Sequence, residues 1–481
     1  MNAPLRKARP YIFWGQTQSL CETCLALVPT KIQILGNEVW YEKRCKHDGV
    51  QSTLVSTDAA YWRLCKDFIK PGDGPLAFQR HTEFGCPYDC GLCPDHEQHS
   101  CLALIEITEH CNLTCPVCFA DSSPARTSFT PLGKIEKMLD ALVASEGEPD
   151  LVQISGGEPT LHPDFFAILD AVRARPIRHV MINTNGLRIA REPDFVAKLA
   201  ENRRGLEIYL QFDSLQREAL VNLRGADLRK IRQQALENLE RHGVSTTLVA
   251  TIKRGVNDGE IGDIVRHALT WKCVRGVTLQ PVQDAGRNEH FNKDTDRIML
   301  SEIRRRVIET GVFGANDMIP LPCNPESISI GYGLRNGDKV LPLTSLFQQE
   351  QLIAVMPNTI SPEKYPVLRE KFVDLFSLSS GPLNTSERVC ELLCCLPSFE
   401  VPEGLTYENV FRVTIVQFLD RFNFCVGNVK RSCIHFVTES GAIIPFDTYN
   451  LFYRNGAIDG IRAAMAGQTY RETRQSEQVP R

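Results

Sequence analysis

Three cysteines, Cys111, Cys115 and Cys118, stand in the run CNLTCPVC. Thiolates at this spacing can hold three irons of a 4Fe-4S cube and leave the fourth iron free to bind another molecule. Zinc sites also use cysteine pairs two residues apart, so the spacing alone does not choose between the two metals. The run Leu102–Ile107, directly before the cysteines, is typical of a strand, and this context favours the cluster.

A second strand-like run, Leu151–Ile154, leads into the turn Gly156-Gly157-Glu158-Pro159. The order of strand, cysteine loop, strand and GGEP turn resembles the radical S-adenosylmethionine (SAM) superfamily. The resemblance implies that the cysteine loop binds a 4Fe-4S cluster after the first strand. It also implies that the GGEP turn holds the amino group of SAM, with glycines that let the backbone approach the ligand closely.

The resemblance further implies radical chemistry. SAM would chelate the open iron through its amino and carboxylate groups. Reductive cleavage of SAM would then give a 5′-deoxyadenosyl radical that takes a hydrogen atom from an unactivated C–H bond. Polar residues at later strand ends are candidate SAM contacts, although each could equally be a barrel-mouth residue bonded within the protein. They are Asn183, Asn185, Gln211 and Asp213, with Lys253 or Arg287 for the carboxylate of SAM.

The same cysteine spacing occurs a second time, in Cys86, Cys90 and Cys93. No convincing strand precedes this copy, and a fourth cysteine, Cys101, follows it. Four thiolates close a cluster, and a closed cluster cannot chelate SAM. We therefore interpret these four cysteines as ligands of an auxiliary 4Fe-4S cluster, with a structural zinc ion as the alternative.

The N-terminal region has its own metal-binding pattern. Cys21, Cys24 and Cys45 flank two short strand-like runs around the turn Gly36-Asn37. Two cysteine-bearing turns joined by a hairpin are typical of a rubredoxin-like or zinc-ribbon site, in which one iron or zinc ion is held tetrahedrally. The fourth ligand is Cys65 or His47, and the alternative for Cys65 is a buried core thiol.

The remaining cysteines lie mostly near the C-terminus. Cys323 stands in a turn-forming run, LPCNP, and Cys433 precedes a hairpin-like segment. A further auxiliary cluster could use these two together with one or two others, although several could instead be buried core thiols. The others are Cys390, Cys394, Cys395 and Cys425.

Strands and helices alternate between these motifs. This pattern predicts an α/β fold, a partial (β/α)6 TIM-type barrel whose chemistry lies at the carboxyl ends of its strands. The predicted strands are 102–107, 151–155, 178–182, 206–212, 246–252 and 277–281, and the predicted helices are 131–145, 163–174, 193–202, 226–242 and 258–271. Further helices are expected near 298–311, 345–356, 363–375 and 404–419.

We divide the chain into five parts. They are an N-terminal metal-binding module (1–70), an auxiliary-cluster segment (71–101), the barrel (102–290), a C-terminal α+β domain that contains cysteines (291–465) and a flexible tail (466–481).

Composition indicates the cellular compartment and argues against one class of partner. The net charge of −4 over 481 residues, with no basic patch, argues against nucleic acid as a partner. Neither a signal peptide nor a membrane-spanning run is visible. Eighteen cysteines without a secretion signal indicate metal ligands in a reducing cytoplasm. Peripheral contact with the inner face of the membrane is compatible with this location.

Motifs on both sides of the barrel core indicate a particular family within the superfamily. The cysteine sets, the run Tyr209–Ser214, the segment Gln280–Arg287 and the run Ile443–Asn450 follow one another in order. This order resembles the archaeal tetraether lipid synthase family and its bacterial relatives, members of which are also described as dihydropterin methyltransferases. The family usually has a cysteine where this chain has Asp447.

This resemblance implies an apolar lipid chain as substrate, coupled carbon to carbon with another chain. Methylation of a 7,8-dihydropterin is the alternative. A flavodoxin- or ferredoxin-type protein would supply electrons, and the oligomeric state is open. The non-enzymatic alternative is an iron–sulfur electron carrier, which has no need of a SAM-binding turn.

Overall fold

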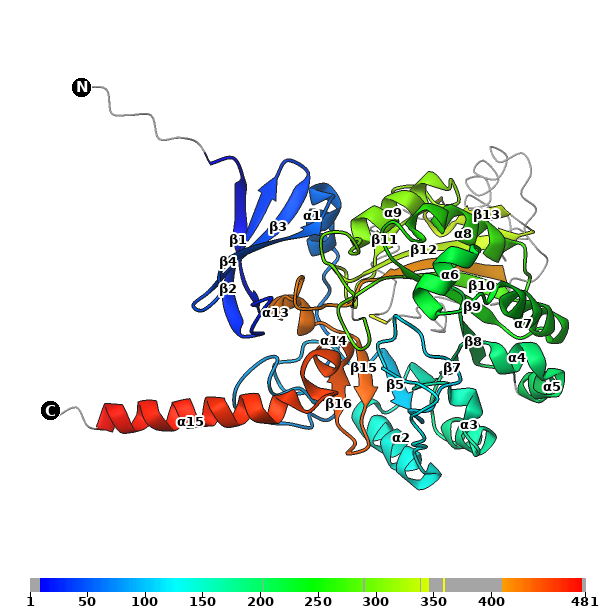
Figure 1. Cartoon of the computed structure of the whole chain (residues 1–481), viewed down its shortest axis with the longest axis horizontal. Coiled ribbons are helices and arrows are strands. Elements are labelled where there is room, and N and C mark those ends of the chain that lie inside the picture. Colours follow the sequence, from blue (N-terminus) through cyan, green and yellow to red (C-terminus); the bar gives the residue numbers. More distant parts are fainter. Residues whose placement is uncertain are drawn as a thin grey trace, which may run out of the picture.

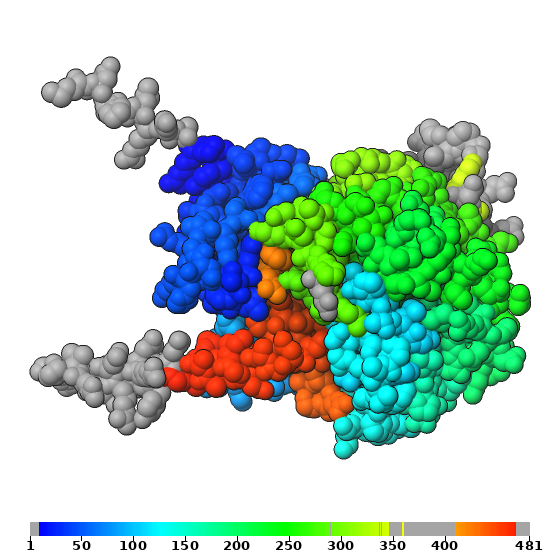
Figure 2. Space-filling view, viewed as in Figure 1, coloured from blue at the N-terminus to red at the C-terminus, as the bar shows by residue number. Residues whose placement is uncertain are grey.

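The computed structural model describes residues 9–201, 203–288, 290–337, 339–345, 358–359 and 409–477. A small N-terminal sheet lies beside a larger α/β body, and the C-terminal helix projects away from that body (Figure 1). Figure 2 shows the N-terminal sheet and this helix as separate projections on the same face of the molecule.

The N-terminal sheet is antiparallel with strand order β1-β2-β3-β4, and the helix α1 (Ala59–Asp67) follows it. The hairpin predicted around Gly36 is confirmed, and this glycine has a φ of 60°. The side chain of Asp58 caps α1 by accepting from the backbone N–H of Tyr61 at 3.0 Å. The strands are β1 (Ile12–Leu20), β2 (Leu27–Leu35), β3 (Glu38–Cys45) and β4 (Gly49–Ser56).

The central strands of the body are parallel neighbours in chain order, and every strand predicted for the barrel is confirmed. Most of their residues are buried, because helices cover the outside of the sheet. The strands are β5 (Leu102–Glu106), β6 (Leu151–Ser155), β7 (His179–Thr184), β8 (Leu206–Gln211), β9 (Thr246–Ile252) and β10 (Val274–Pro281).

The predicted barrel helices are also confirmed. They are α2 (Leu132–Glu146), α3 (Phe165–Arg173), α5 (Pro193–Glu201), α7 (Arg229–His242) and α8 (Ile261–Leu269). Gly243 ends α7 in the left-handed conformation, as its sequence predicts. The sequence analysis missed the short helices α4 (Leu187–Arg191) and α6 (Arg217–Arg224), together with the 3-10 turns Pro159–Leu161 and Asp258–Glu260.

The chain after β10 does not build a sheet of its own. Strand β14 (Val410–Val416) pairs in parallel with β10, and β15 (Ile434–Val437) pairs in parallel with β5. The helix predicted over 404–419 is therefore wrong at β14. Within VFRVTIV, Arg412 and Thr414 alternate with apolar residues, and most of those are β-branched, so the run has the pattern of a strand. The boundary predicted at residue 290 separates segments that share one sheet.

Antiparallel strands extend both ends of this sheet, and short helices connect them. The strands are β11 (Ile319–Pro320), β12 (Ile328–Asn336), β13 (Lys339–Pro342) and β16 (Ile443–Pro445). The helices are α9 (Leu300–Glu309), which confirms the prediction at 298–311, then α13 (Val426–Val429), α14 (Phe446–Thr448), a 3-10 turn at Leu343–Ser345 and a π-helical turn at Tyr449–Tyr453.

Most of the segment 466–481, which was predicted to be a flexible tail, belongs to the last helix, α15 (Ala457–Glu477). Its sequence contains Ala, Gln, Glu and Arg, which favour helix even without packing. Apart from residue 345, the helices predicted over 345–356 and 363–375 lie outside the described residues, as do Cys390, Cys394 and Cys395. Within the described part of the chain, no helix combines the length and apolar character needed to span a bilayer.

Candidate functional site

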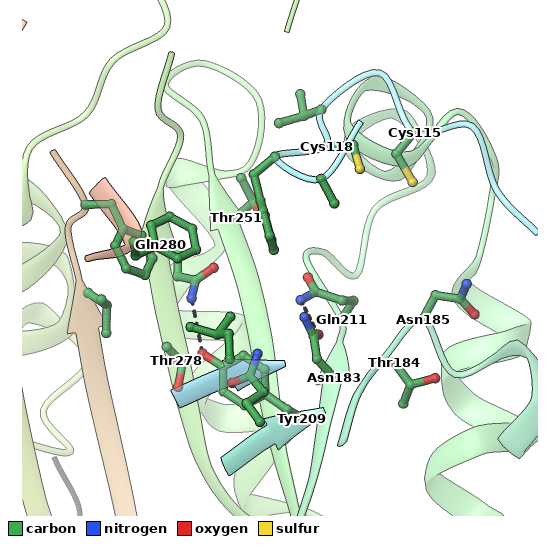
Figure 3. A pocket seen from close by; sticks show the side chains of 18 of the residues that line it. Cys115, Cys118, Asn183, Thr184, Asn185, Tyr209, Gln211, Thr251, Thr278 and Gln280 are labelled. Atoms are coloured by element: carbon green, nitrogen blue, oxygen red, sulfur yellow. Dashed lines mark hydrogen bonds between the residues drawn. The ribbon is translucent and has the colours of Figure 1, made fainter. Parts of the chain in front are cut away.

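A cavity of about 180 Å³ lies inside the barrel, at the carboxyl ends of the strands. Alternate residues along each strand face it, because side chains on a strand alternate between the two faces of a sheet. Met181 and Asn183 on β7, and Tyr209 and Gln211 on β8, are examples. Cys115 and Cys118 lie at one end of the cavity and Tyr209 at the other, with Asn183 and Gln211 between them (Figure 3).

The cysteine loop forms the upper wall of this cavity. Cys111, Cys115 and Cys118 all line it, and Cys111 is buried. Burial raises the pKa of the Cys111 thiol to about 12, so bound iron is needed to favour its thiolate. Arg287 holds the loop in shape: its Nε donates to the carbonyl of Cys115 at 2.7 Å, and its backbone N–H donates to the carbonyl of Cys118 at 2.8 Å. Arg287 was predicted to bind the SAM carboxylate. Its side chain does not line the cavity, so this role stays a prediction.

The GGEP turn needs glycine at both positions because the backbone that leads into the cysteine loop lies too close for a side chain. A Cβ on Gly156 would lie 2.3 Å from the carbonyl oxygen of Thr108, and one on Gly157 would lie 2.1 Å from that of His110. Gly157 and Glu158 donate backbone hydrogen bonds to these two carbonyls, each at 2.8 Å. The turn is thus fitted against the segment that leads into Cys111, while both glycines also line the cavity.

The Glu158 side chain supports the cavity without lining it. Its buried carboxylate accepts from the Thr160 hydroxyl at 2.5 Å, the Thr184 hydroxyl at 2.7 Å and the Asn185 backbone N–H at 2.7 Å. Burial raises its pKa, and these donors oppose that shift. Glu158 therefore ties the turn after β6 to the turn after β7. Neither Glu158 nor Pro159 lines the cavity, so both stay predictions as SAM contacts.

A chain of hydrogen bonds links the polar residues of the cavity. Gln211 donates to Asn183 at 2.9 Å and accepts from Arg224 at 3.2 Å. Arg224 also donates to both carboxylate oxygens of Asp213, at 2.5 and 2.7 Å. Asp213 was predicted to contact SAM or substrate. Instead it is fully buried behind Arg224 and does not line the cavity.

Asn185 lies beside the first cysteine. Its side-chain amide donates to Asn112 at 2.7 Å and lies 3.9 Å from the Cys111 sulfur. Lys253 does not reach the cavity, and its ammonium pairs with Asp296 at 3.2 Å. The prediction that Lys253 binds the SAM carboxylate therefore gains no support from this arrangement and stays a prediction.

These residues fit an iron–sulfur cluster with SAM. Three thiols face one space, and Gly156 and Gly157 bring backbone without side chains to its wall. Amide side chains offer donors and acceptors to an adenosyl or amino-acid group.

The other end of the cavity has two surfaces whose residues were not among the predicted site residues. We call Tyr209, Thr278 and Gln280 the polar triad, since Gln280 donates to the Tyr209 hydroxyl at 3.2 Å and Thr278 also bonds it. The apolar wall consists of Phe119, Val416, Phe418, Ile434 and Phe446. Period-two spacing from Gln211 could have indicated Tyr209, but most of the wall needs β14 and β15 in place.

The N-terminal cysteines form a compact group. The ligand atoms of Cys21, Cys24, Cys45 and Asp48 all lie within 4.8 Å of one another. Neither Cys65 nor His47, the two predicted fourth ligands, belongs to this group, and His47 as a ligand stays a prediction. Cys65 lies in α1 and packs into the barrel core, as the alternative held. Asp48 was missed because it is not a thiol, although a carboxylate is an ordinary zinc ligand.

Cys101 does not join Cys86, Cys90 and Cys93. Its sulfur lies within 4.8 Å of those of Cys323 and Cys433. The prediction of one four-cysteine set is corrected, since Cys101 immediately precedes β5, which pairs with β15 just after Cys433.

The other three cysteines line a separate small cavity with His96. Cys425 lies elsewhere, 3.2 Å from the Thr17 hydroxyl of the N-terminal sheet. Asp447 accepts from the Leu419 N–H at 2.7 Å and the Ser432 hydroxyl at 3.1 Å.

Comparisons with known proteins agree with this geometry. The model of the radical SAM superfamily matches residues 105–268, and that of the HMPTM N-terminal zinc ribbon domain matches residues 13–57. The chain is 30% identical to the 7,8-dihydro-6-hydroxymethylpterin dimethyltransferase of Methanocaldococcus jannaschii, over 91% of this chain and 94% of that protein.

More distant similarities cover less than half of the chain. The GTP 3′,8-cyclase of Chlorobaculum tepidum is 32% identical over 43% of this chain and 60% of its own length. The crystal structure of Streptococcus suis SuiB bound to S-adenosylmethionine matches 44% of this chain and 47% of its own, with a TM-score of 0.35 and 19% identity.

Proposed function

This chain belongs to the radical SAM superfamily, in the family of the M. jannaschii dimethyltransferase, and we propose that it methylates a carbon atom of a dihydropterin-type substrate. The observation that carries this proposal is the 30% identity over nearly the whole of both chains. That span includes the N-terminal ribbon and the C-terminal strands as well as the barrel.

The residues of the cavity have separate tasks in this reaction. When bound, the cluster and SAM supply a radical able to abstract a hydrogen atom from substrate carbon. Cys111, Cys115 and Cys118 hold the cluster, and the amides of Asn183, Asn185 and Gln211 face SAM. The apolar wall keeps water away from the reacting carbon.

The polar triad supports a heterocyclic substrate. Its hydroxyl and amide groups offer donors and acceptors to the edge of a pterin ring. Burial raises the pKa of Tyr209 to about 12, so its hydroxyl stays protonated and able to donate. Among the described residues that line the cavity there is no carboxylate, so amide oxygens would accept from the ring N–H groups.

A lipid alkyl chain is the second candidate substrate, and the apolar wall favours it. Phe418 stacks on Phe446 with ring centroids 3.8 Å apart, and Phe119 packs edge-on against Phe446 at 5.4 Å. These aromatic side chains form a surface suited to methylene groups. The reaction on this substrate would be carbon–carbon coupling between two chains.

The test uses anaerobically reconstituted enzyme with SAM and 7,8-dihydro-6-hydroxymethylpterin, analysed by mass spectrometry. We expect methylated pterin and, from a substrate deuterated at the reacting carbon, deuterium in 5′-deoxyadenosine. A parallel assay expresses the gene in a host without coupled lipid tails. Coupled tails without methylated pterin would overturn the pterin proposal and support the lipid. Neither product would overturn both.

Two variants separate the substrates by geometry. Gln280→Leu removes part of the polar triad and should lower turnover of a pterin far more than that of a lipid. Phe446→Ala opens the apolar wall and should do the reverse. The matched control replaces Cys111, Cys115 and Cys118 together by alanine, which should abolish SAM cleavage with either substrate.

The other cysteine groups complete the proposed cofactor set. Cys21, Cys24, Cys45 and Asp48 hold a single zinc or iron ion. The Cys86, Cys90 and Cys93 group and the Cys101, Cys323 and Cys433 group hold auxiliary centres, and a flavodoxin- or ferredoxin-type protein supplies electrons.

A further inference from the structure

Arg232 is a buried cation that the roles described above leave unexplained. It lies on α7, lines the cavity between the cysteine loop and the turn after β7, and is only 2% exposed. One terminal nitrogen, Nη1, donates to the backbone carbonyl of Asn185. The other two nitrogens, Nε and Nη2, have no hydrogen-bond partner among the described residues.

A guanidinium in this state is costly. A buried charge without a partner loses its hydration and gains nothing in exchange. Burial lowers the pKa of Arg232 to about 10, in spite of the opposing attraction of Asp213. Such a group is normally kept where it meets an anion.

The two carboxylates that attract Arg232 are not free to serve as that anion. Asp213 accepts from Arg224 through both oxygens, at 2.5 and 2.7 Å, and from the Thr251 backbone N–H at 3.2 Å. Glu158 is occupied by Thr160, Thr184 and the Asn185 N–H. Since the described lining of the cavity contains no acidic side chain, the missing anion must come with a ligand.

The position of Arg232 identifies the anion. Asn185, which Arg232 contacts, lies 3.9 Å from the Cys111 sulfur, at the cluster end of the cavity. SAM bound at a cluster held by these cysteines would bring the one carboxylate of its amino acid part to that end. A carboxylate oxygen not bound to iron would need donors in a site shielded from water.

We infer that Arg232 binds the α-carboxylate of SAM through its two free N–H groups. This assigns to α7 the role that the sequence analysis gave to Lys253 or Arg287, both of which are engaged elsewhere. The inference rests on the use of SAM and not on the identity of the substrate. It makes tight binding depend on a carboxylate that decarboxylated SAM lacks.

The experiment is a binding cycle on cluster-loaded protein without reductant. The dissociation constants of SAM and of decarboxylated SAM are measured for wild type, Arg232→Met and Arg232→Lys. A pair of charge-assisted hydrogen bonds is typically worth roughly 10- to 100-fold in affinity. We therefore expect the preference of wild type for SAM to fall by about tenfold or more in R232M, with R232K in between. Chelation of iron by the carboxylate keeps the rest of the preference.

Lys253→Met is the matched control, because it removes a cation that does not line the cavity. It should keep the wild-type ratio of the two dissociation constants. Equal ratios in wild type and R232M would overturn the inference, as would a loss of preference in K253M alone.

A second readout needs neither cluster nor SAM. In the unloaded protein Arg232 has no anion, so R232M should melt at the wild-type temperature or above it. A purely structural role for Arg232 predicts a lower Tm and an unchanged preference for SAM. If R232M cannot be isolated, R232K decides, since an unchanged ratio in that variant also refutes carboxylate binding.

Discussion

Replacing Gly157 by alanine adds a single methyl group at the point where the GGEP turn meets the cysteine loop. That carbon would lie 2.1 Å from the carbonyl oxygen of His110, 2.6 Å from its carbonyl carbon and 3.0 Å from the carbonyl oxygen of Glu109. All three atoms are backbone, so no side chain can rotate away. Either the turn or the segment before Cys111 must move.

The size of the effect follows from what is displaced. Overpacking of this kind typically costs roughly 1–3 kcal/mol. The shift also strains two backbone hydrogen bonds of 2.8 Å, from Gly157 to Thr108 and from Glu158 to His110, each worth about 1 kcal/mol. The expected loss in the free energy of unfolding is thus roughly 3–5 kcal/mol. Because His110 adjoins Cys111, the variant should also lose the open cluster.

Urea denaturation of the unloaded protein measures the first effect, and iron and sulfide content after anaerobic reconstitution measures the second. Gly133→Ala is the matched control. Gly133 lies in the first turn of α2 with nothing within 4 Å of an added Cβ, so alanine should stabilise that helix by up to about 1 kcal/mol. If G157A unfolds like wild type and loads a full cluster, the fit of the glycine turn against the cysteine loop does not matter as described.

Three further predictions concern the other centres and the pH dependence. Asp48→Ala should weaken retention of the N-terminal metal ion against a chelator by roughly tenfold or more, and unchanged retention would remove Asp48 from the site. Cys101→Ser and Cys433→Ser should each lose the iron of the same centre, so the double variant should contain no less iron than either single variant. Cys101→Ser combined with Cys93→Ser should lose the iron of two centres, which is the sum of the two single losses. Burial raises the pKa of Asp447 from 3.8 to about 6, so the folded state binds the proton more tightly and Asp447 favours folding as the pH falls through 6. Wild type should therefore gain roughly 1 kcal/mol over Asp447→Asn between pH 7 and pH 5 in denaturation experiments, and a constant difference would contradict this.

Much of the barrel could be predicted from the sequence. Each predicted barrel strand and helix is present, because local hydrophobic periodicity and end signals such as Gly243 act within a few residues of the chain. The cavity is lined or supported by Cys111, Cys115, Cys118 and the GGEP turn, as predicted. Each of these motifs was recognised from the spacing of residues within a short stretch next to a predicted strand.

The C-terminal segment contains a local pattern that was interpreted wrongly. The run Phe411–Val416 was expected to be helical, although Arg412 and Thr414 alternate with Phe411, Val413 and Ile415 as they would in a strand. Its pairing with β10 and β12, which no local pattern shows, brings Val416 and Phe418 to the cavity.

The ligand sets and the polar interior also depend on contacts between distant parts of the chain. Cys101 lies with Cys323 and Cys433, more than two hundred residues away, because β5 and β15 are neighbours in the sheet. Asp213 was a predicted site residue, yet Arg224 covers it, while Arg232, which the sequence analysis did not name, proves to be a buried cation facing the cavity. The sequence by itself determined which residues could do chemistry and which strands carry them. Which of them share a site was decided by the tertiary structure, because that depends on strand pairing and on which polar groups satisfy one another, and neither leaves a short-range pattern in the chain.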